Sequence, residues 1–399
     1  MSIHRIQVLG QHGDGVVRDG ENTLHIPKVL AGEAVELIDG KVGRIVLPSP
    51  QRIVPFCRHY SLCGGCKLQH WRYEPYAAWK RQLVTDALAG QGLVVDVAPL
   101  IDAHGAGRRR VSLHVRQQNG AWVAGFMEQK SHDLCAIDQC PVLAPELQQA
   151  PAIASAFGPS LGACDVAVTM TSGGLDVAIK AERKAVPRRV ESLMALARNH
   201  RLARLSINGE VLVTLQQPIV TIGRVRVLLP VQSFLQATDR GEEVLSNLVV
   251  QHVSGAKHVA DLFCGIGPFA LRIAEASRVT AYDSDGPVIA NLQLAVRNTQ
   301  GLKPVSAEVR NLFRAPLIVA ELKEHDAVVF DPPRAGADTQ AREIAKSNVK
   351  CVVAVSCNAG TFARDAAILV KGGYALKSVT PVDQFKYTAH VEIVALFTR

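Results

Sequence analysis

The chain has 399 residues, enough for two or three domains, and its composition is that of a globular protein, with 48% hydrophobic and 20% charged residues. This apolar content excludes a disordered chain. No apolar run has the length of a signal peptide or of the roughly 18 residues in a membrane span, so we expect a cytoplasmic protein without a membrane partner. Lys and Arg (44) exceed Asp and Glu (36) by 8, which permits a nucleic-acid partner without requiring one.

Residues 3–47 are predicted to form short strands. Gly13-Asp14-Gly15, Asp19-Gly20 and Asp39-Gly40 separate segments rich in Val, Ile and Leu, as turns do. We therefore expect a small barrel over residues 1–50. Such barrels often bind RNA, although an ordinary β-domain would show the same pattern.

Three of the nine cysteines lie in one short segment, Cys57-x5-Cys63-Gly64-Gly65-Cys66. In a reducing compartment this grouping favours metal binding over disulfides. Four thiolates can hold zinc or an iron–sulfur cluster, and spacing alone does not decide between them. Cys140 and Cys135 are the candidates for the fourth ligand.

RNA contact is suggested by basic and aromatic residues, because cations bind phosphate and aromatic rings stack on exposed bases. A solvated charged face explains any single one of them equally well. These residues are Arg108-Arg109-Arg110, Arg58, His59, Lys67, Trp71 and Arg72.

From about 109 to 230 the sequence predicts antiparallel hairpins. Asn119-Gly120 joins one pair of alternating segments, and Asn208-Gly209 joins a second pair, 203–207 and 211–216. We expect a β-rich central domain over residues 51–232.

After residue 235, buried strands alternate with helical segments, which predicts a doubly wound parallel sheet. The predicted domain covers residues 233–399. Its core strands are Lys257–Phe263, Arg278–Asp283, Asp326–Asp331 and Cys351–Ser356.

A cofactor site is predicted where the first of these strands ends in Gly265-Ile266-Gly267-Pro268. Eighteen residues after Gly265, Asp283 ends the second strand, where a carboxylate can accept hydrogen bonds from ribose hydroxyls. The turn lacks the third glycine of the pyrophosphate fingerprint, and Pro268 removes a backbone donor that a phosphate would need. These features favour S-adenosylmethionine over a dinucleotide.

Asp331-Pro332-Pro333-Arg334 follows a core strand, on the rim where open α/β sheets bind ligands. Enzymes that methylate amino groups usually have an aromatic residue where Arg334 stands. The arginine favours a ring carbon as the methyl acceptor.

Cys357 ends another strand, just before a predicted helix, whose exposed N–H groups should stabilise a thiolate. A thiolate that adds to carbon 6 of uracil makes carbon 5 nucleophilic, and a base must then remove the carbon-5 proton. Glu392, an acid at the start of an apolar strand, is the candidate base. Cys351, inside the preceding strand, and Cys164 and Cys264 are expected to be structural.

In this order, the motifs around Gln236, Asp261–Gly267, Asp331–Gly336, Ser356–Asp365 and His390–Glu392 closely resemble the RNA uracil-5 methyltransferases. The resemblance spans essentially the whole chain. It is strongest to the iron–sulfur branch that modifies 23S ribosomal RNA, and residues 13–33 resemble a shortened TRAM-type (OB-like) barrel. The implied fold is a Rossmann-like methyltransferase domain preceded by the β-rich domain and this barrel.

The resemblance also implies roles for individual residues. Cys357 would be the nucleophile and Glu392 the base, and a 4Fe–4S cluster would be held by Cys57, Cys63, Cys66 and Cys140. Pro268 departs from the family pattern, which often has Asn there, so that cofactor contact would be lost or replaced. The S-adenosylmethionine pocket would be lined by Gln236, Phe263, Asp283, Asn311 and Asp331.

The expected partner is RNA, with 23S ribosomal RNA first and transfer RNA as the alternative, and no obligate protein partner is implied. The transfer-RNA branch generally lacks the barrel and the cluster. A DNA cytosine-5 methyltransferase has proline before its nucleophile, whereas Ser356 precedes Cys357 here. An RNA-binding scaffold with a decayed catalytic domain should have lost one of Cys357, Glu392 and Asp331.

Overall fold

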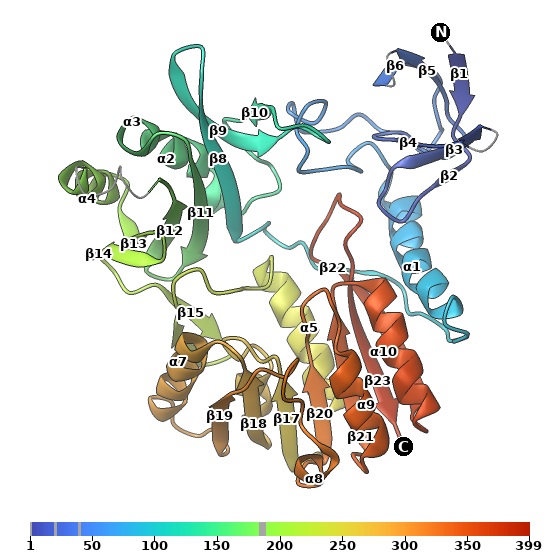
Figure 1. Ribbon diagram of the computed structural model, residues 1–399, viewed down its shortest axis with the longest axis vertical. Helices are drawn as coiled ribbons and strands as arrows, with labels where there is room; N and C mark the ends of the chain where they lie inside the picture. Colours follow the sequence, from blue (N-terminus) through green and yellow to red (C-terminus); the bar gives the residue numbers. More distant parts are fainter. Residues whose placement is uncertain (1, 20–21, 39–40, 183–188) are drawn as a thin grey trace.

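The computed structural model describes residues 2–19, 22–38, 41–182 and 189–399, and Figure 1 shows three groups of elements. The N-terminal strands lie at one upper side, the central sheet lies at the other, and the C-terminal sheet with its helices lies below both. None of the described helices is both long and apolar enough to cross a bilayer.

The N-terminal strands form two three-stranded antiparallel sheets, β1-β5-β6 and β2-β3-β4. They enclose a small core that includes Ile6, Val17 and Val35. Gly20, Asp39 and Gly40 of the predicted turns lie outside the described residues. The strand bounds are β1 Ser2–Arg5, β2 Val8–Leu9, β3 Gly15–Asp19, β4 Asn22–Ile26, β5 Ala34–Ile38 and β6 Lys41–Leu47.

The central region is a seven-stranded sheet in the order β10-β9-β8-β11-β12-β13-β14. Both predicted hairpins are confirmed: Asn119-Gly120 joins the antiparallel strands β8 and β9, and Asn208-Gly209 joins β13 and β14. The strands are β8 Arg110–Gln118, β9 Ala121–Met127, β10 Leu134–Ala136, β11 Cys164–Thr171, β12 Gly174–Lys180, β13 Leu202–Ile207 and β14 Glu210–Thr214. The helices are α2 Ala150–Ala156, α3 Gly158–Leu161 and α4 Val190–Asn199, with a short 3₁₀ turn at Pro145–Leu147.

The C-terminal sheet has eight strands in the order β19-β18-β17-β20-β21-β23-β22-β7, all parallel to their neighbours except β23. Because side chains alternate along a strand, Val259 packs on one face with α5, α6 and α7, and Ala260 packs on the other with α1, α9 and α10. The predicted doubly wound sheet is confirmed. The strands are β17 His258–Leu262, β18 Arg278–Asp283, β19 Val305–Val309, β20 Ala327–Phe330, β21 Cys351–Ser356, β22 Ala375–Asp383 and β23 Glu392–Thr398. The helices are α5 Asp239–His252, α6 Ala270–Ile273, α7 Gly286–Arg297, α8 Val319–Leu322, α9 Asp338–Lys346 and α10 Ala359–Lys371.

Two elements that precede the central sheet pack against the C-terminal one. Helix α1 (Tyr73–Ala89) contacts α10, and β7 (Ile101–Asp102) pairs with β22. The fully buried Lys80 of α1 donates a 2.6 Å hydrogen bond to Asp383 at the end of β22. A two-stranded sheet, β15 (Ile219–Ile222) with β16 (Val225–Leu228), also joins this core. The division of the chain at residues 50 and 232 stays a prediction.

Candidate active site

A cavity of about 550 Å³ opens at the carboxyl ends of β17, β18, β20 and β21. The strand order reverses between β17 and β20, and ligands bind at such reversals in open α/β sheets. All seven residues that the sequence proposed for cofactor binding and catalysis line this one cavity: Gln236, Phe263, Asp283, Asn311, Asp331, Cys357 and Glu392.

One half of the cavity is built by the turn after β17. Gly267 has a positive φ of 88°, and a Cβ there would stand 2.7 Å from a Leu292 methyl group, so glycine is required. Asp283 accepts a 2.9 Å hydrogen bond from the Gly265 N–H, which fixes the turn against β18. Pro268 lines the same wall, where it offers no N–H.

Aromatic rings cover this half of the cavity. Phe263 and Phe313 lie 5.4 Å apart between ring centroids, and both line the cavity. Asn311 turns the chain that carries Phe313, because its side-chain oxygen accepts the N–H groups of Phe313 and Arg314. An apolar slot beside the Asp283 carboxylate suits a nucleoside, which has a flat base and polar ribose hydroxyls.

Cys357 follows β21 and lines the same cavity, but the helix behind it does not keep it a thiolate. Asn358 caps α10 and accepts the Gly360 and Thr361 N–H groups at 2.9 and 3.2 Å, so those donors are already used. Burial, and then the charge of Glu392, raise the pKa of the Cys357 thiol to about 11. The expectation of a helix-stabilised thiolate is wrong for the protein without substrate.

Glu392 is buried and belongs to a chain of polar side chains that the sequence did not reveal. The Gln384 amide donates to Glu392 at 3.1 Å and to Gln236 at 2.6 Å, and Gln236 donates to Asp331 at 3.3 Å. The Gln384 oxygen accepts the Ala237 N–H at 2.8 Å, which fixes the amide orientation. Burial raises the pKa of both Glu392 and Asp331, and the charge of Asp331 raises the pKa of Glu392 further.

Gln384 is therefore the positioning residue that the sequence analysis missed. It is fully buried in the segment between β22 and β23, and Asp383 before it is tied to α1 through Lys80. A run of polar residues between two apolar strands was the available signal. Solvent-exposed loops have the same composition, so the signal could not identify the contacts.

Arg334 and His390 stand at the mouth of the cavity. Their side chains approach to 3.0 Å, and burial together with the Arg334 charge lowers the pKa of His390 to about 4. Both residues also line a groove of about 1210 Å³ that contains Cys357 and extends to the N-terminal strands and Trp79 of α1. Arg334, Cys357 and His390 thus lie on both the cavity and this groove.

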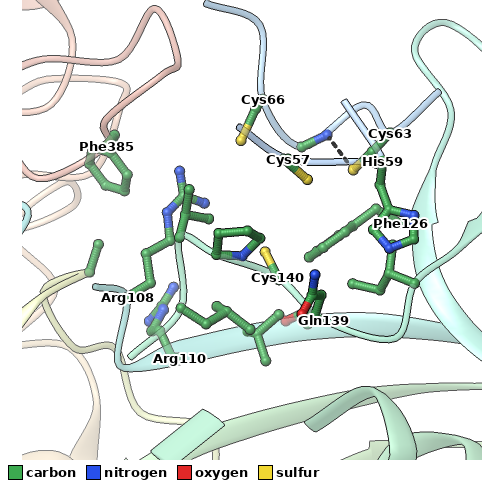
Figure 2. Close-up of a pocket in the computed structure, with 18 of the residues that line it drawn as sticks. Cys57, His59, Cys63, Cys66, Arg108, Arg110, Phe126, Gln139, Cys140 and Phe385 are labelled. Atoms are coloured by element: carbon green, nitrogen blue, oxygen red, sulfur yellow. Dashed lines mark hydrogen bonds between the residues drawn. The ribbon is translucent and has the colours of Figure 1, made fainter. Parts of the chain in front are cut away.

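A second cavity, of about 510 Å³, lies beside the first and is named the cysteine cavity here. Cys57, Cys63, Cys66 and Cys140 line it together, whereas Cys135 does not (Figure 2). The Gly65 N–H donates to the Cys63 sulfur at 3.3 Å.

These four cysteines are free thiols. Burial raises the pKa of Cys63, Cys66 and Cys140, the last to about 12. In the described part of the chain, no three potential ligands stand close enough to hold a metal ion. A donor set of four thiols on one cavity nevertheless fits zinc or an iron–sulfur cluster chemically.

The three consecutive arginines have different environments. Arg109 is buried and donates to Asp239 and Glu242 at 2.7 and 2.6 Å, so it is structural rather than a contact for RNA. Arg110 is exposed and lies 4.9 Å from the Phe234 ring, and Arg108 lines the cysteine cavity.

The other basic and aromatic residues also differ from expectation. Arg58 and His59 pair with Asp138, Lys67 donates to the His12 carbonyl, and Trp71 is only 8% exposed. Trp71 therefore cannot stack on a base as predicted. Arg72 stays exposed beside it. Of the three cysteines expected to be structural, Cys164 and Cys264 lie in hydrophobic cores and Cys351 is partly buried.

Comparison with known proteins agrees with this geometry. The sequence model of the tRNA (uracil-5-)-methyltransferase family matches residues 232–399. An uncharacterised RNA methyltransferase of Brucella suis biovar 1 (strain 1330) is 45% identical, over 99% of this chain and 97% of its own. The 23S rRNA (uracil(1939)-C(5))-methyltransferase RlmD of Vibrio parahaemolyticus is 29% identical, over 99% of this chain and 95% of its own.

Among solved structures, the fold matches the tRNA (uracil-54, C5)-methyltransferase of Pyrococcus abyssi in complex with S-adenosyl-L-homocysteine. The TM-score is 0.78, the identity is 22%, and 99% of each chain is covered. A tRNA enzyme thus has this fold over its whole length. The N-terminal strands and central sheet therefore do not by themselves distinguish the two RNA substrates.

Proposed function

Because the chain belongs to the RNA (uracil-5-)-methyltransferase family and is an enzyme of it, we propose that it methylates carbon 5 of a uridine with Cys357 as nucleophile and Glu392 as base. The observation that carries this proposal is that both side chains line the cavity that also contains Asp283, Asp331 and the aromatic slot. S-adenosylmethionine, when bound in that slot, supplies the methyl group.

The reaction begins at the sulfur. The Cys357 thiol gives its proton to solvent water, and the thiolate then adds to carbon 6 of the uracil ring, which moves the electron pair of the 5,6 double bond towards carbon 5 and the carbon-4 oxygen. The raised pKa of the Cys357 thiol keeps the side chain mostly protonated at neutral pH. Arg334 favours the thiolate, because its charge lowers the pKa of Cys357.

The reaction ends at the carboxylate. After carbon 5 has accepted the methyl group it still carries its proton, which Glu392 removes while the bond between Cys357 and carbon 6 breaks. Burial gives Glu392 a raised pKa and therefore makes its carboxylate a stronger base than an exposed one. Gln384 holds this carboxylate toward Gln236 and Asp331.

We propose 23S ribosomal RNA as the substrate because RlmD resembles this chain over nearly the full length of both. Transfer RNA is the alternative, favoured by the whole-length fold match to a tRNA enzyme. The target base has to leave its stack to reach Cys357, which favours a loop over a duplex. Residues 1–50 are proposed as a TRAM-like RNA-binding barrel.

We also propose that Cys57, Cys63, Cys66 and Cys140 hold a 4Fe–4S cluster. The donor set supports it, as four thiols line one cavity. Cluster binding has to release the protons of these four thiols and to bring their sulfur atoms closer together. Methyl transfer requires no electrons, so the cluster would be structural and would tie the 57–66 loop to the segment after β10.

Two variants test the chemistry. Cys357→Ala should abolish methylation and leave S-adenosylmethionine binding intact, and near-normal turnover would remove the covalent mechanism. Glu392→Gln should trap an RNA adduct that survives a denaturing gel, because Cys357 can add but the carbon-5 proton stays. If no adduct forms while S-adenosylmethionine is bound, Glu392 is not the base. Mapping 5-methyluridine in total RNA of a strain that lacks the protein decides between ribosomal and transfer RNA.

A further inference from the structure

The loop between β22 and β23, residues 384–391, carries the side chain that orients the candidate base, and is named the Gln384 loop here. The Gln384 amide donates to Glu392 at 3.1 Å. The Lys80 ammonium donates to main-chain carbonyls near both ends of the loop, at 3.3 and 2.6 Å. In Figure 1 the loop reaches up from the C-terminal sheet toward the two upper groups of elements. The position of Gln384 therefore depends on what holds the middle of this loop.

Tyr387, in the middle of the Gln384 loop, has an unusual backbone. Its φ is 66°, a left-handed conformation that a bulky residue rarely adopts unless its surroundings impose it. The Tyr387 N–H donates to the Tyr76 hydroxyl at 2.9 Å, and that hydroxyl donates to Asp383 at 2.7 Å. The Tyr387 ring packs against the hydrophobic core of the central sheet. Contacts from outside the loop thus fix the conformation of Tyr387.

Both ends of the stretch that carries three of the cysteines meet at Tyr387. The residue before the first of these cysteines, Phe56, packs edge-on against the Tyr387 ring, with 5.2 Å between ring centroids. The two residues after the third cysteine, Lys67 and Leu68, both donate their N–H groups to the Tyr387 carbonyl, at 2.8 and 3.1 Å. We name residues 56–68 the cysteine segment. It is the part of the central domain that holds Tyr387.

We propose that Tyr387 is a positioning residue through which the cysteine segment controls the catalytic base. While the segment is seated, its contacts with Tyr387 hold the Gln384 loop, and Gln384 keeps Glu392 oriented for removal of the carbon-5 proton. The inference rests on the proposed function, because it takes Glu392 as the base. Three of the four proposed cluster ligands belong to the cysteine segment, so loss of the cluster would displace the base without touching it.

The test shifts the cysteine segment without removing a thiol. Gly64→Ala does this, because a Cβ at Gly64 would stand 2.7 Å from the Met127 carbonyl oxygen, and the segment has to move. Gly286→Ala is the matched control, since a Cβ there meets no described atom within 4 Å beyond its chain neighbours. Gly286 lines neither the catalytic cavity nor the cysteine cavity.

A second pair of variants changes Tyr387 itself. Tyr387→Ala removes the ring, and Tyr387→Phe keeps it. Trp122→Ala is the control for the loss of a partly buried aromatic residue from the same hydrophobic core. The groups whose charges act on Glu392 are unchanged in all of these variants; they are Asp331, Lys80 and Arg334.

In protein without RNA, Gly64→Ala and Tyr387→Ala should each accelerate amide hydrogen exchange of residues 383–391 about tenfold. Each should also lower kcat about tenfold while the KM for S-adenosylmethionine stays unchanged. The pH–rate profile of methylation should move up by about one unit, because the Gln384 hydrogen bond lowers the pKa of Glu392 and its loss raises that pKa. The double variant should be no worse than the more affected single variant, since both changes break one connection.

Tyr387→Phe and the two control variants should behave as wild type. The inference is overturned if Gly64→Ala speeds exchange in the cysteine segment but leaves the Gln384 loop and the pH–rate profile unchanged. Additive effects of the two changes, or an equal profile shift in Trp122→Ala, would overturn it as well. If thermal unfolding shows that Tyr387→Ala is not folded, Gly64→Ala decides. Because exchange is measured without RNA, failure of the wild-type protein to methylate RNA would remove the proposed function and not this connection.

Discussion

Arg109→Ala should destabilise the C-terminal domain strongly. The Arg109 guanidinium binds the Gln236 carbonyl, Asp239 and Glu242, and Glu242 is only 5% exposed. Removing one partner of a buried ion pair costs about 3–5 kcal/mol, because the other charge is left buried. The exposed Asp239 adds at most about 1 kcal/mol. Arg272, 3.3 Å from Glu242, compensates in part, so we expect the lower end, about 3 kcal/mol.

Urea unfolding followed by far-UV circular dichroism measures this loss. With a slope of about 3 kcal/mol per M, a loss of 3 kcal/mol lowers the unfolding midpoint by about 1 M. Arg110→Ala is the control, because Arg110 is exposed and, among the described residues, forms only a stacking contact with Phe234, so its cost should stay within about 0.5 kcal/mol. Equal midpoints for the two variants would show that burial does not distinguish neighbouring arginines here.

Three further predictions follow from the site. The rate of Cys357 alkylation by iodoacetamide in the free protein should rise about tenfold per pH unit from pH 7 to 9, because the raised pKa leaves the thiolate scarce, and a plateau near pH 8 would contradict this. Gln384→Leu should move the pH–rate profile of methylation to higher pH, because the Gln384 hydrogen bond lowers the pKa of Glu392 and its removal raises that pKa; an unmoved profile would reduce Gln384 to a packing role. Anaerobically purified protein should be brown and contain iron, which Cys140→Ser should lower and Cys135→Ser should not; a colourless zinc protein would remove the cluster proposal.

The strands and hairpins of the fold could be predicted from local sequence signals. Asn119-Gly120 and Asn208-Gly209 adopt the backbone that tight hairpins need, and the structure has a hairpin at each. The runs at Arg278–Asp283 and Cys351–Ser356 are strands with the predicted bounds. Both signals act between residues close in the chain, which is why they can be recognised without the rest of the molecule.

The residues of the candidate site could also be predicted from the sequence, because polar residues stand at the ends of the predicted strands. Parallel strands bring their carboxyl ends to one edge, so Asp283, Asp331 and Cys357 had to meet there. Glu392 reaches the same edge from the amino end of β23, because this strand runs antiparallel to its neighbours.

Contacts between distant residues decided what those side chains do. Within one run of three arginines, Arg109 is paired by residues about 130 positions away, whereas Arg108 keeps two buried donors without acceptors. Asn358, not Cys357, takes the N–H groups of the helix. The sequence by itself therefore determined which elements form and which edge carries the chemistry, since periodicity and turn preferences are local. Only the tertiary structure decided burial, pairing and protonation, because these depend on which remote groups share a low-dielectric space.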